Sequence, residues 1–296
     1  MKITKKLLAL VLVLTMTLGL GVTANAASDD KPILALGADL STDQRAAVLG
    51  LLGVDESDLA NYDVISITNA DEHEYLDKYL DASIIGTRAL SSVLVVGKEA
   101  GNGIHVTTKN ISYCTEGMYR NALLTAGIED ADITVAGPFS ISGTAALVGA
   151  IKAYETMTGE EIDDENLDAA NDELVLTGKL VEDIGDSEKA EDLMALVKQE
   201  VAENKLTSAE DIQNVVDQAC DQLDIQLSEE NQKQIAELMK KIEGLDLDVD
   251  KLKDQAKDLY QKLEDLDFHV DKESVGNFFT RIIDAIVNFF QGLFGK

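Results

Sequence analysis

The segment Phe139–Thr144, FSISGT, follows an apolar run and places hydroxyl side chains around a glycine. The apolar run predicts a strand, and the residues after it predict a helix with Ser142 as its N-cap. Free backbone N–H groups at the start of a helix, close to Gly143 and to the hydroxyls of Ser142 and Thr144, could hold an anionic or carbonyl oxygen. The alternative is structural: Ser142 caps the helix and Gly143 allows close packing.

Two earlier turns, Gly37–Ser41 and Thr68–Asp71, also carry small polar residues where apolar runs end. In an open parallel sheet such turns gather at the carboxyl edge of the strands, where ligands usually bind. We therefore expect any ligand to bind at this edge. The candidate ligand-binding residues are Asp39, Ser140, Ser142, Gly143 and Thr144.

Nucleophilic catalysis has weaker support in the residues. FSISG lacks the first glycine of the G-x-S-x-G turn that exposes a catalytic serine. Cys114 and His105 could form a thiol–imidazole pair only if the fold brought them together. An extracellular hydrolase that uses Ser142 or Cys114 is therefore kept as an alternative, and no catalytic residue is assigned.

Two acidic segments begin like a calcium-binding EF-hand loop. In the segment from Asp246, Lys251 stands where the loop needs glycine and Lys257 stands where it needs a bidentate glutamate. A second segment, from Asp164, fails at the same two positions. We predict no metal site, and no phosphate-binding loop or other motif indicates a cofactor.

Short apolar runs alternate with helical patterns as far as residue 158. This alternation predicts an α/β layered domain, residues 27–158, in which helices cover a mixed sheet. A Ser41-x-x-Gln44 capping box opens its first helix. Two apolar runs around a Gly-rich stretch at residues 97–103 predict one hairpin.

The pattern changes after residue 158. Apolar residues recur at i, i+3 and i+4, while acidic and lysine residues fill the remaining positions. This spacing predicts an acidic helical domain over residues 159–273. The expected fold class is therefore α+β, an N-terminal α/β layered domain followed by an all-helical C-terminal region.

Cys114 and Cys220 are the only cysteines, and they fall in these two different regions. In an exported protein they could form a disulfide. They could equally be two small buried hydrophobic side chains. The sequence leaves both possibilities open.

The first residues predict a signal peptide, residues 1–26. Basic MKITKK precedes the apolar run LLALVLVLTMTLGLGV, and Ala24-Asn25-Ala26 forms an A-x-A cleavage site. Cleavage there would give a secreted or cell-surface protein. An uncleaved N-terminal membrane anchor is the alternative.

The charge balance excludes one class of partner. Asp and Glu number 55 against 25 Lys and Arg, which gives a formal net charge of −30. Phosphate backbones repel such a chain, so we expect no nucleic-acid partner. The apolar fraction of 45% argues against a disordered acidic chain.

The last segment, residues 274–296, holds five of the seven phenylalanines and predicts an amphipathic helix. Its other face is too polar to span a bilayer. The apolar face therefore folds back onto the protein, docks to a second copy or a protein partner, or lies on a membrane surface. The residues expected on this face include Phe278, Phe279, Ile282, Ile283, Ile286, Phe289, Phe290, Leu293 and Phe294.

Several motifs together resemble an exported family of Gram-positive bacteria, the domain of unknown function 1002. They are the turn at Gly37–Ser41, the pair Asn110-Ile111, MYRNAL at Met118–Leu123 and PFSISGTAAL at Pro138–Leu147. The resemblance implies a secreted or surface-retained protein. It supplies no activity, cofactor or catalytic residue.

These observations predict a secreted or cell-surface protein that is not an enzyme. Its α/β domain would bind a ligand at the strand-edge turns, and its C-terminal helix would dock to itself, to a cell-envelope partner or to the membrane surface.

Overall fold

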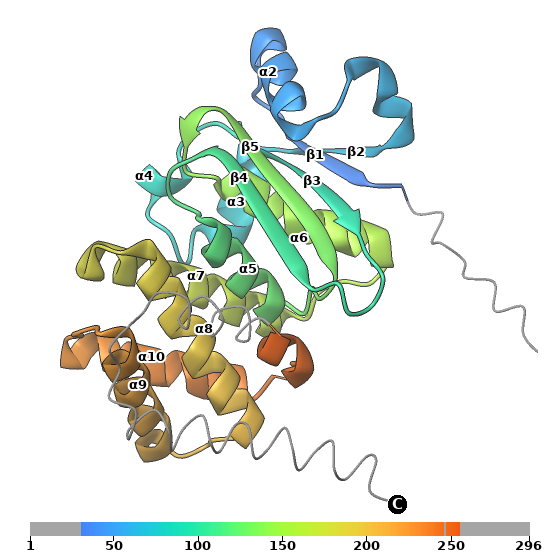
Figure 1. The fold of residues 1–296 in the computed structure, drawn as a ribbon. Helices are drawn as coiled ribbons and strands as arrows, with labels where there is room; N and C mark the ends of the chain where they lie inside the picture. The colour runs from blue at the N-terminus through green and yellow to red at the C-terminus, as the bar shows by residue number, and fades with distance from the viewer. Residues whose placement is uncertain (1–30, 246, 255–296) are drawn as a thin grey trace, which may run out of the picture. The chain divides into compact units, whose positions relative to one another are not determined.

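The computed structural model describes residues 31–245 and 247–254, which belong to one compact unit. A five-stranded sheet with its helices is followed by a region built of helices, which confirms the predicted α+β fold (Figure 1). The predicted signal peptide (1–26), the predicted C-terminal helix (274–296) and part of the predicted helical domain (255–273) lie outside the described residues.

The sheet has the strand order β2-β1-β3-β5-β4. β1 is parallel to β2, β4 is parallel to β5, and β3 is antiparallel to both β1 and β5. Four strands thus share one direction, so their carboxyl ends lie at the same edge of the sheet as the first residues of β3. The strands are β1 (Ile33–Gly37), β2 (Asp63–Ile67), β3 (Ser92–Gly97), β4 (Ile104–Ile111) and β5 (Ala131–Ile141).

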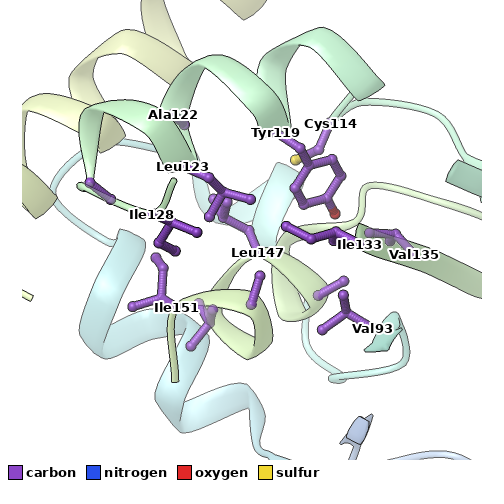
Figure 2. Packing of buried hydrophobic residues seen from close by; sticks show 14 of the residues in the cluster. Val93, Cys114, Tyr119, Ala122, Leu123, Ile128, Ile133, Val135, Leu147 and Ile151 are labelled. Carbon is purple, nitrogen blue, oxygen red and sulfur yellow. The ribbon is translucent and has the colours of Figure 1, made fainter. Parts of the chain in front are cut away.

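Side chains that alternate along β1 enter two separate cores, as the pleat of a strand requires. Leu34 and Leu36 pack under α2 (Thr42–Leu52) on one face, beside the 3-10 helix η1 (Glu56–Asn61). Ile33 and Ala35 belong to the larger core on the other face. Figure 2 shows part of that larger core, where side chains of the sheet and of the helices interdigitate. The helices around it include α3 (Asn69–Leu76), α4 (Ala82–Ile85), α5 (Glu116–Thr125) and α6 (Thr144–Thr158).

The hairpin predicted around residues 97–103 is wrong, because β5 lies between β3 and β4. β5 is buried along most of its length and needs a neighbour on each side, whereas His105 and Lys109 leave β4 exposed enough for an edge. The Gly-rich stretch instead wraps around the start of β5. There the Asp130 carboxylate accepts hydrogen bonds from the backbone N–H groups of Gly101 and Gly103, at 3.0 and 2.7 Å.

Of the two predicted helix caps, one is confirmed and one is wrong. Ser41 and Gln44 form the predicted capping box at the start of α2. At α6 the N-cap is Gly143 and not Ser142, because Gly143 turns the chain with a φ of 99°. The Ser142 hydroxyl is therefore free of capping and lies 3.2 Å from the hydroxyl oxygen of Thr144.

The helical region packs around a second core, which joins the sheet through α7. Leu174 of α7 belongs to the larger sheet core, whereas Leu180 of the same helix belongs to the helical core. None of the described helices is long and apolar enough to cross a membrane. The helices of this region include α7 (Asp164–Ile184), α8 (Ser187–Asn204), α9 (Ala209–Leu223) and α10 (Glu229–Glu243).

A buried ion pair connects the two regions. Lys198 of α8 and Glu173 of α7 are both fully buried, with Lys198 Nζ at 2.9 Å from Glu173 Oε1. Lys198 Nζ also donates to α5, to the backbone oxygen of Asn121 at 2.9 Å and to Thr125 Oγ1 at 3.0 Å. Burial lowers the pKa of Lys198, while the Glu173 charge opposes this shift. Three helices from both regions therefore meet at one ammonium group.

Replacing Lys198 should test how much the fold depends on this pair. Lys198→Met leaves the Glu173 carboxylate buried without its counter-charge, and the free energy of unfolding should fall by about 3–5 kcal/mol. Urea unfolding followed by circular dichroism measures the loss.

Two further variants make the test specific. Lys233→Met breaks an exposed pair with Glu237 and should cost less than about 1 kcal/mol. Lys198→Met combined with Glu173→Leu should recover most of the loss, because no unpaired charge is left. Equal losses for Lys198→Met and Lys233→Met would contradict the assigned role.

Candidate functional site

A cavity of about 390 Å³ opens at the carboxyl edge of the sheet. Its wall comes from four places along the chain: α3, the segment from α4 to the start of β3, the residues after β4, and the junction of β5 with α6. Its volume lies within the range of small-molecule sites. The lining residues central to the site are Glu72, Arg88, Tyr113, Phe139, Ser142 and Thr144.

The structure brings together only some of the residues predicted for this edge. Ser142 and Thr144 line the cavity, and Gly143 is buried between them. Ser140 is exposed and does not line the cavity. Asp39 also lies outside the lining, where its carboxylate accepts a 2.8 Å hydrogen bond from the backbone N–H of Ala89. Asp39 thereby anchors the segment that leads into β3.

Glu72, which no sequence motif singles out, is the buried acid of the cavity. Glu72 is 1% exposed, and its Oε1 accepts a 2.7 Å hydrogen bond from Thr144 Oγ1. Its Oε2 accepts a hydrogen bond from the Asn69 side-chain amide at 3.1 Å. Burial raises the pKa of Glu72, and these two hydrogen bonds offset the shift only in part. A signal existed in the sequence: Glu72 lies four residues before the apolar Leu76 and so shares its inward helix face.

The neighbouring Asp71 holds α3 against α6, which fixes the position of Glu72. Asp71 pairs with Lys152 of α6 and accepts hydrogen bonds from the backbone and side chain of Thr68, the N-cap of α3. Burial alone would raise the pKa of Asp71, but these bonds outweigh it and lower the pKa to about 2. Adjacent carboxyl groups on one helix therefore have opposite pKa shifts.

Gly143 sits where no other residue fits. Its φ of 99° belongs to the left-handed region, and a Cβ there would lie 2.7 Å from Tyr119 Oη and 2.8 Å from a methyl carbon of Ile111. Tyr119 Oη donates to the Gly143 backbone oxygen at 2.6 Å. The close packing expected of Gly143 is thus present, and it sets the direction in which Ser142 and Thr144 leave the turn.

Cys114 lies beneath this turn and is poorly suited to nucleophilic chemistry. It is fully buried beside Tyr119 (Figure 2), and burial raises the pKa of the Cys114 thiol to about 12. A thiol that stays protonated at neutral pH is a weak nucleophile. His105 lies near the opposite end of β4, where it contacts Asp132 at 3.3 Å. The fold therefore separates Cys114 from His105, and the thiol–imidazole pair considered for them does not form.

Cys114 and Cys220 are both free thiols, and they lie in different cores. Cys114 belongs to the larger sheet core and Cys220 to the helical core. The sequence allowed either a disulfide or two buried thiols, and in the structure both cysteines are buried and unpaired.

The acidic segments considered for calcium have other contacts. Asp168 pairs with Lys241 from within α7. Asp248 accepts backbone hydrogen bonds from Asp250 and Lys251. Over residues 31–245 and 247–254, no group of three or more His, Cys, Asp or Glu side chains is placed to hold a metal ion.

The arrangement at the cavity is a chain of hydrogen-bonding groups that runs from buried to accessible. It starts at the Glu72 carboxylate, passes through the Thr144 hydroxyl and ends at the Ser142 hydroxyl. The acid therefore contacts Ser142 only through Thr144. Chemically, such a chain presents fixed donors and acceptors to a polar ligand.

Comparison with known proteins places the chain in a family. It belongs to the family described as "Protein of unknown function (DUF1002)", whose model matches residues 36–259. A relative in Bacillus subtilis (strain 168), described as "Uncharacterized protein YpuA", is 39% identical over 273 residues, covering 90% of this chain and 92% of the relative. No solved structure matches.

Glu72→Gln should change how stability depends on pH. Because the folded protein raises the pKa of Glu72, the folded state binds a proton that the unfolded state has lost, so wild-type stability gains as pH falls from 8 towards 5. The glutamine variant lacks this gain. The difference in free energy of unfolding should therefore shift in favour of the wild type on acidification, by at most about 1.4 kcal/mol per pH unit.

Urea unfolding at pH 5, 6, 7 and 8 measures this difference. The Asp71 contribution is present in both proteins above a pH of about 4 and cancels in the comparison. A difference that stays constant from pH 8 to 5 would contradict the raised pKa of Glu72.

Proposed function

We propose that this protein is a non-enzymatic binding protein of the cell envelope, exported by its N-terminal segment, whose sheet edge holds a small ligand. The observation that carries the proposal is the cavity at Ser142 and Thr144. Buried and partly buried polar groups converge on it from separate elements, which is the usual character of a ligand site. Export is supported by the basic and apolar segments before Ala24-Asn25-Ala26.

Ligand binding is tested by blocking the cavity. Ser112 is an exposed residue of the lining, so Ser112→Trp should fill the cavity without disturbing the core. Ser140→Trp adds the same side chain at an exposed position outside the lining and is the matched control. The probe is a library of small polar fragments, detected by amide chemical shifts of the chain that starts at Ala27.

We expect fragments that shift the amide signals of Ser112, Ser142 and Thr144. The affinity of these fragments, measured from the amide shifts, should fall at least tenfold in Ser112→Trp. It should be unchanged in Ser140→Trp. Fragments that bind elsewhere, or that bind the two variants equally, would overturn the proposed site.

Export is tested by fractionating Bacillus subtilis cells that express the full chain. We expect the protein in the medium or on the cell surface, with Ala27 as its first residue by mass spectrometry. A variant that lacks residues 2–26 should stay in the cytoplasm. A variant that ends at Val275 tests whether the last residues determine if the protein stays on the cell surface or enters the medium. Recovery of the uncleaved full chain in the cytoplasm would refute export.

Hydrolysis with Ser142 as nucleophile is the second candidate. It is favoured by the hydroxyl chain that links Ser142 to Glu72 through Thr144. A general base normally contacts the hydroxyl that it activates, and here Thr144 intervenes. The geometry therefore favours binding over catalysis.

A fluorophosphonate probe, which labels activated serine hydroxyls, separates the two candidates. We expect no labelling of the wild type above that of Ser142→Ala. Labelling that disappears in Ser142→Ala and persists in Ser140→Ala would instead establish the hydrolase.

A further inference from the structure

The charged groups of the cavity indicate an uncharged ligand. Among the lining residues, the charge-bearing side chains are Glu72 and Arg88, one acidic and one basic. A strongly anionic ligand would meet a single guanidinium on a chain of net charge −30, and a cationic ligand would meet a single, deeply buried acid. The remaining polar side chains of the wall are mainly short hydroxyls: Ser83, Thr87, Ser91, Ser112, Ser142 and Thr144.

The buried acid keeps hydrogen-bonding capacity for a ligand. Each Glu72 oxygen accepts one hydrogen bond from the protein, from Thr144 and from Asn69. A carboxyl group offers more acceptor positions than these two, and each hydroxyl can both donate and accept. Because the Thr144 hydroxyl donates to Glu72, the Ser142 hydroxyl donates to Thr144, and its oxygen can still accept a hydrogen bond from a ligand. A ligand that carries several hydroxyl groups matches such a wall.

Phe139 adds an apolar platform beside these polar groups. It is 46% exposed and is one of two large hydrophobic side chains exposed in the described part of the chain. Single exposed hydrophobic residues are common, but Phe139 lines the cavity together with Ile141 and the ring of Tyr113. The electron-rich face of an aromatic ring attracts polarised C–H groups. The cavity thus pairs an aromatic face with clustered hydroxyls.

A ligand that complements this wall would be a ring with hydroxyl groups at its edge and C–H groups on one face. We propose that the cavity binds a neutral saccharide, with the C–H face of one sugar ring on Phe139 and its hydroxyls hydrogen-bonded to Ser142 and to the Glu72–Thr144 pair. The proposal rests on the proposed function, because it names the ligand class of the same site. Arg88, exposed at the wall, would donate a hydrogen bond to the ring oxygen or to a neighbouring hydroxyl oxygen of the sugar.

An array of neutral and acidic glycans, probed with the labelled chain from Ala27 onward, tests the ligand class. We expect binding to at least one neutral glycan, confirmed by calorimetry and by amide shifts at Ser142 and Thr144. Phe139→Ala should weaken this binding at least tenfold without loss of stability, because Phe139 is exposed. Ser140→Ala is the matched control and should bind as the wild type does.

The outcomes separate the saccharide proposal from the proposed function. Binding to acidic glycans alone, equal binding by Phe139→Ala, or no glycan binding would overturn the saccharide. The proposed function would survive any of these results if polar fragments still bind at Ser142 and are blocked by Ser112→Trp. If neither glycans nor fragments bind at this cavity, both proposals fall.

Discussion

The fold depends on neutralising one lysine ammonium that is fully buried. Lys198 reaches the interior from α8, and its partners come from α7 and α5, so the helical region is held to the layer that covers the sheet. A buried ion pair gains little net stability over apolar side chains, but an unmatched partner costs several kcal/mol. The pair therefore contributes more to the specificity of helix packing than to the net stability of the fold. A docking of α8 that buried Lys198 away from Glu173 would leave both charges unmatched.

The candidate site is connected to this arrangement through α7. Tyr113, in the cavity wall, packs against α7, where a Cβ on Gly178 would lie 2.5 Å from Tyr113 Oη. On the other side, Lys152 and Asp71 hold α3 against α6, which brings Glu72 to Thr144. The polar groups of the cavity are consequently fixed by packed helices and not by loops alone. Such preorganisation reduces the entropy lost when a ligand binds.

The sequence predicts much of the local structure and little of the long-range pairing. Residues 131–141 are the strand β5 as expected, and Ser41 with Gln44 caps α2, because both depend on neighbouring residues. The site was found only in part. Glu72 and Thr144 are 72 residues apart, so no spacing rule connects them. Serine favours the N-cap position, so the sequence predicts Ser142 as the cap of α6, but the tightly packed Gly143 occupies that position and the helix starts one residue later.

The strand order also sets the sequence in which the molecule can assemble. β5 is an interior strand of the sheet, between β3 and β4, yet it is the last of the five along the chain. Until residues 131–141 are available, β3 and β4 each lack a neighbour, and the sheet cannot close from its first four strands alone. Pairing of this kind is slow because it joins distant parts of the chain. Because this interior strand follows the other four along the chain, the sheet is completed only after residues 131–141 have been synthesised.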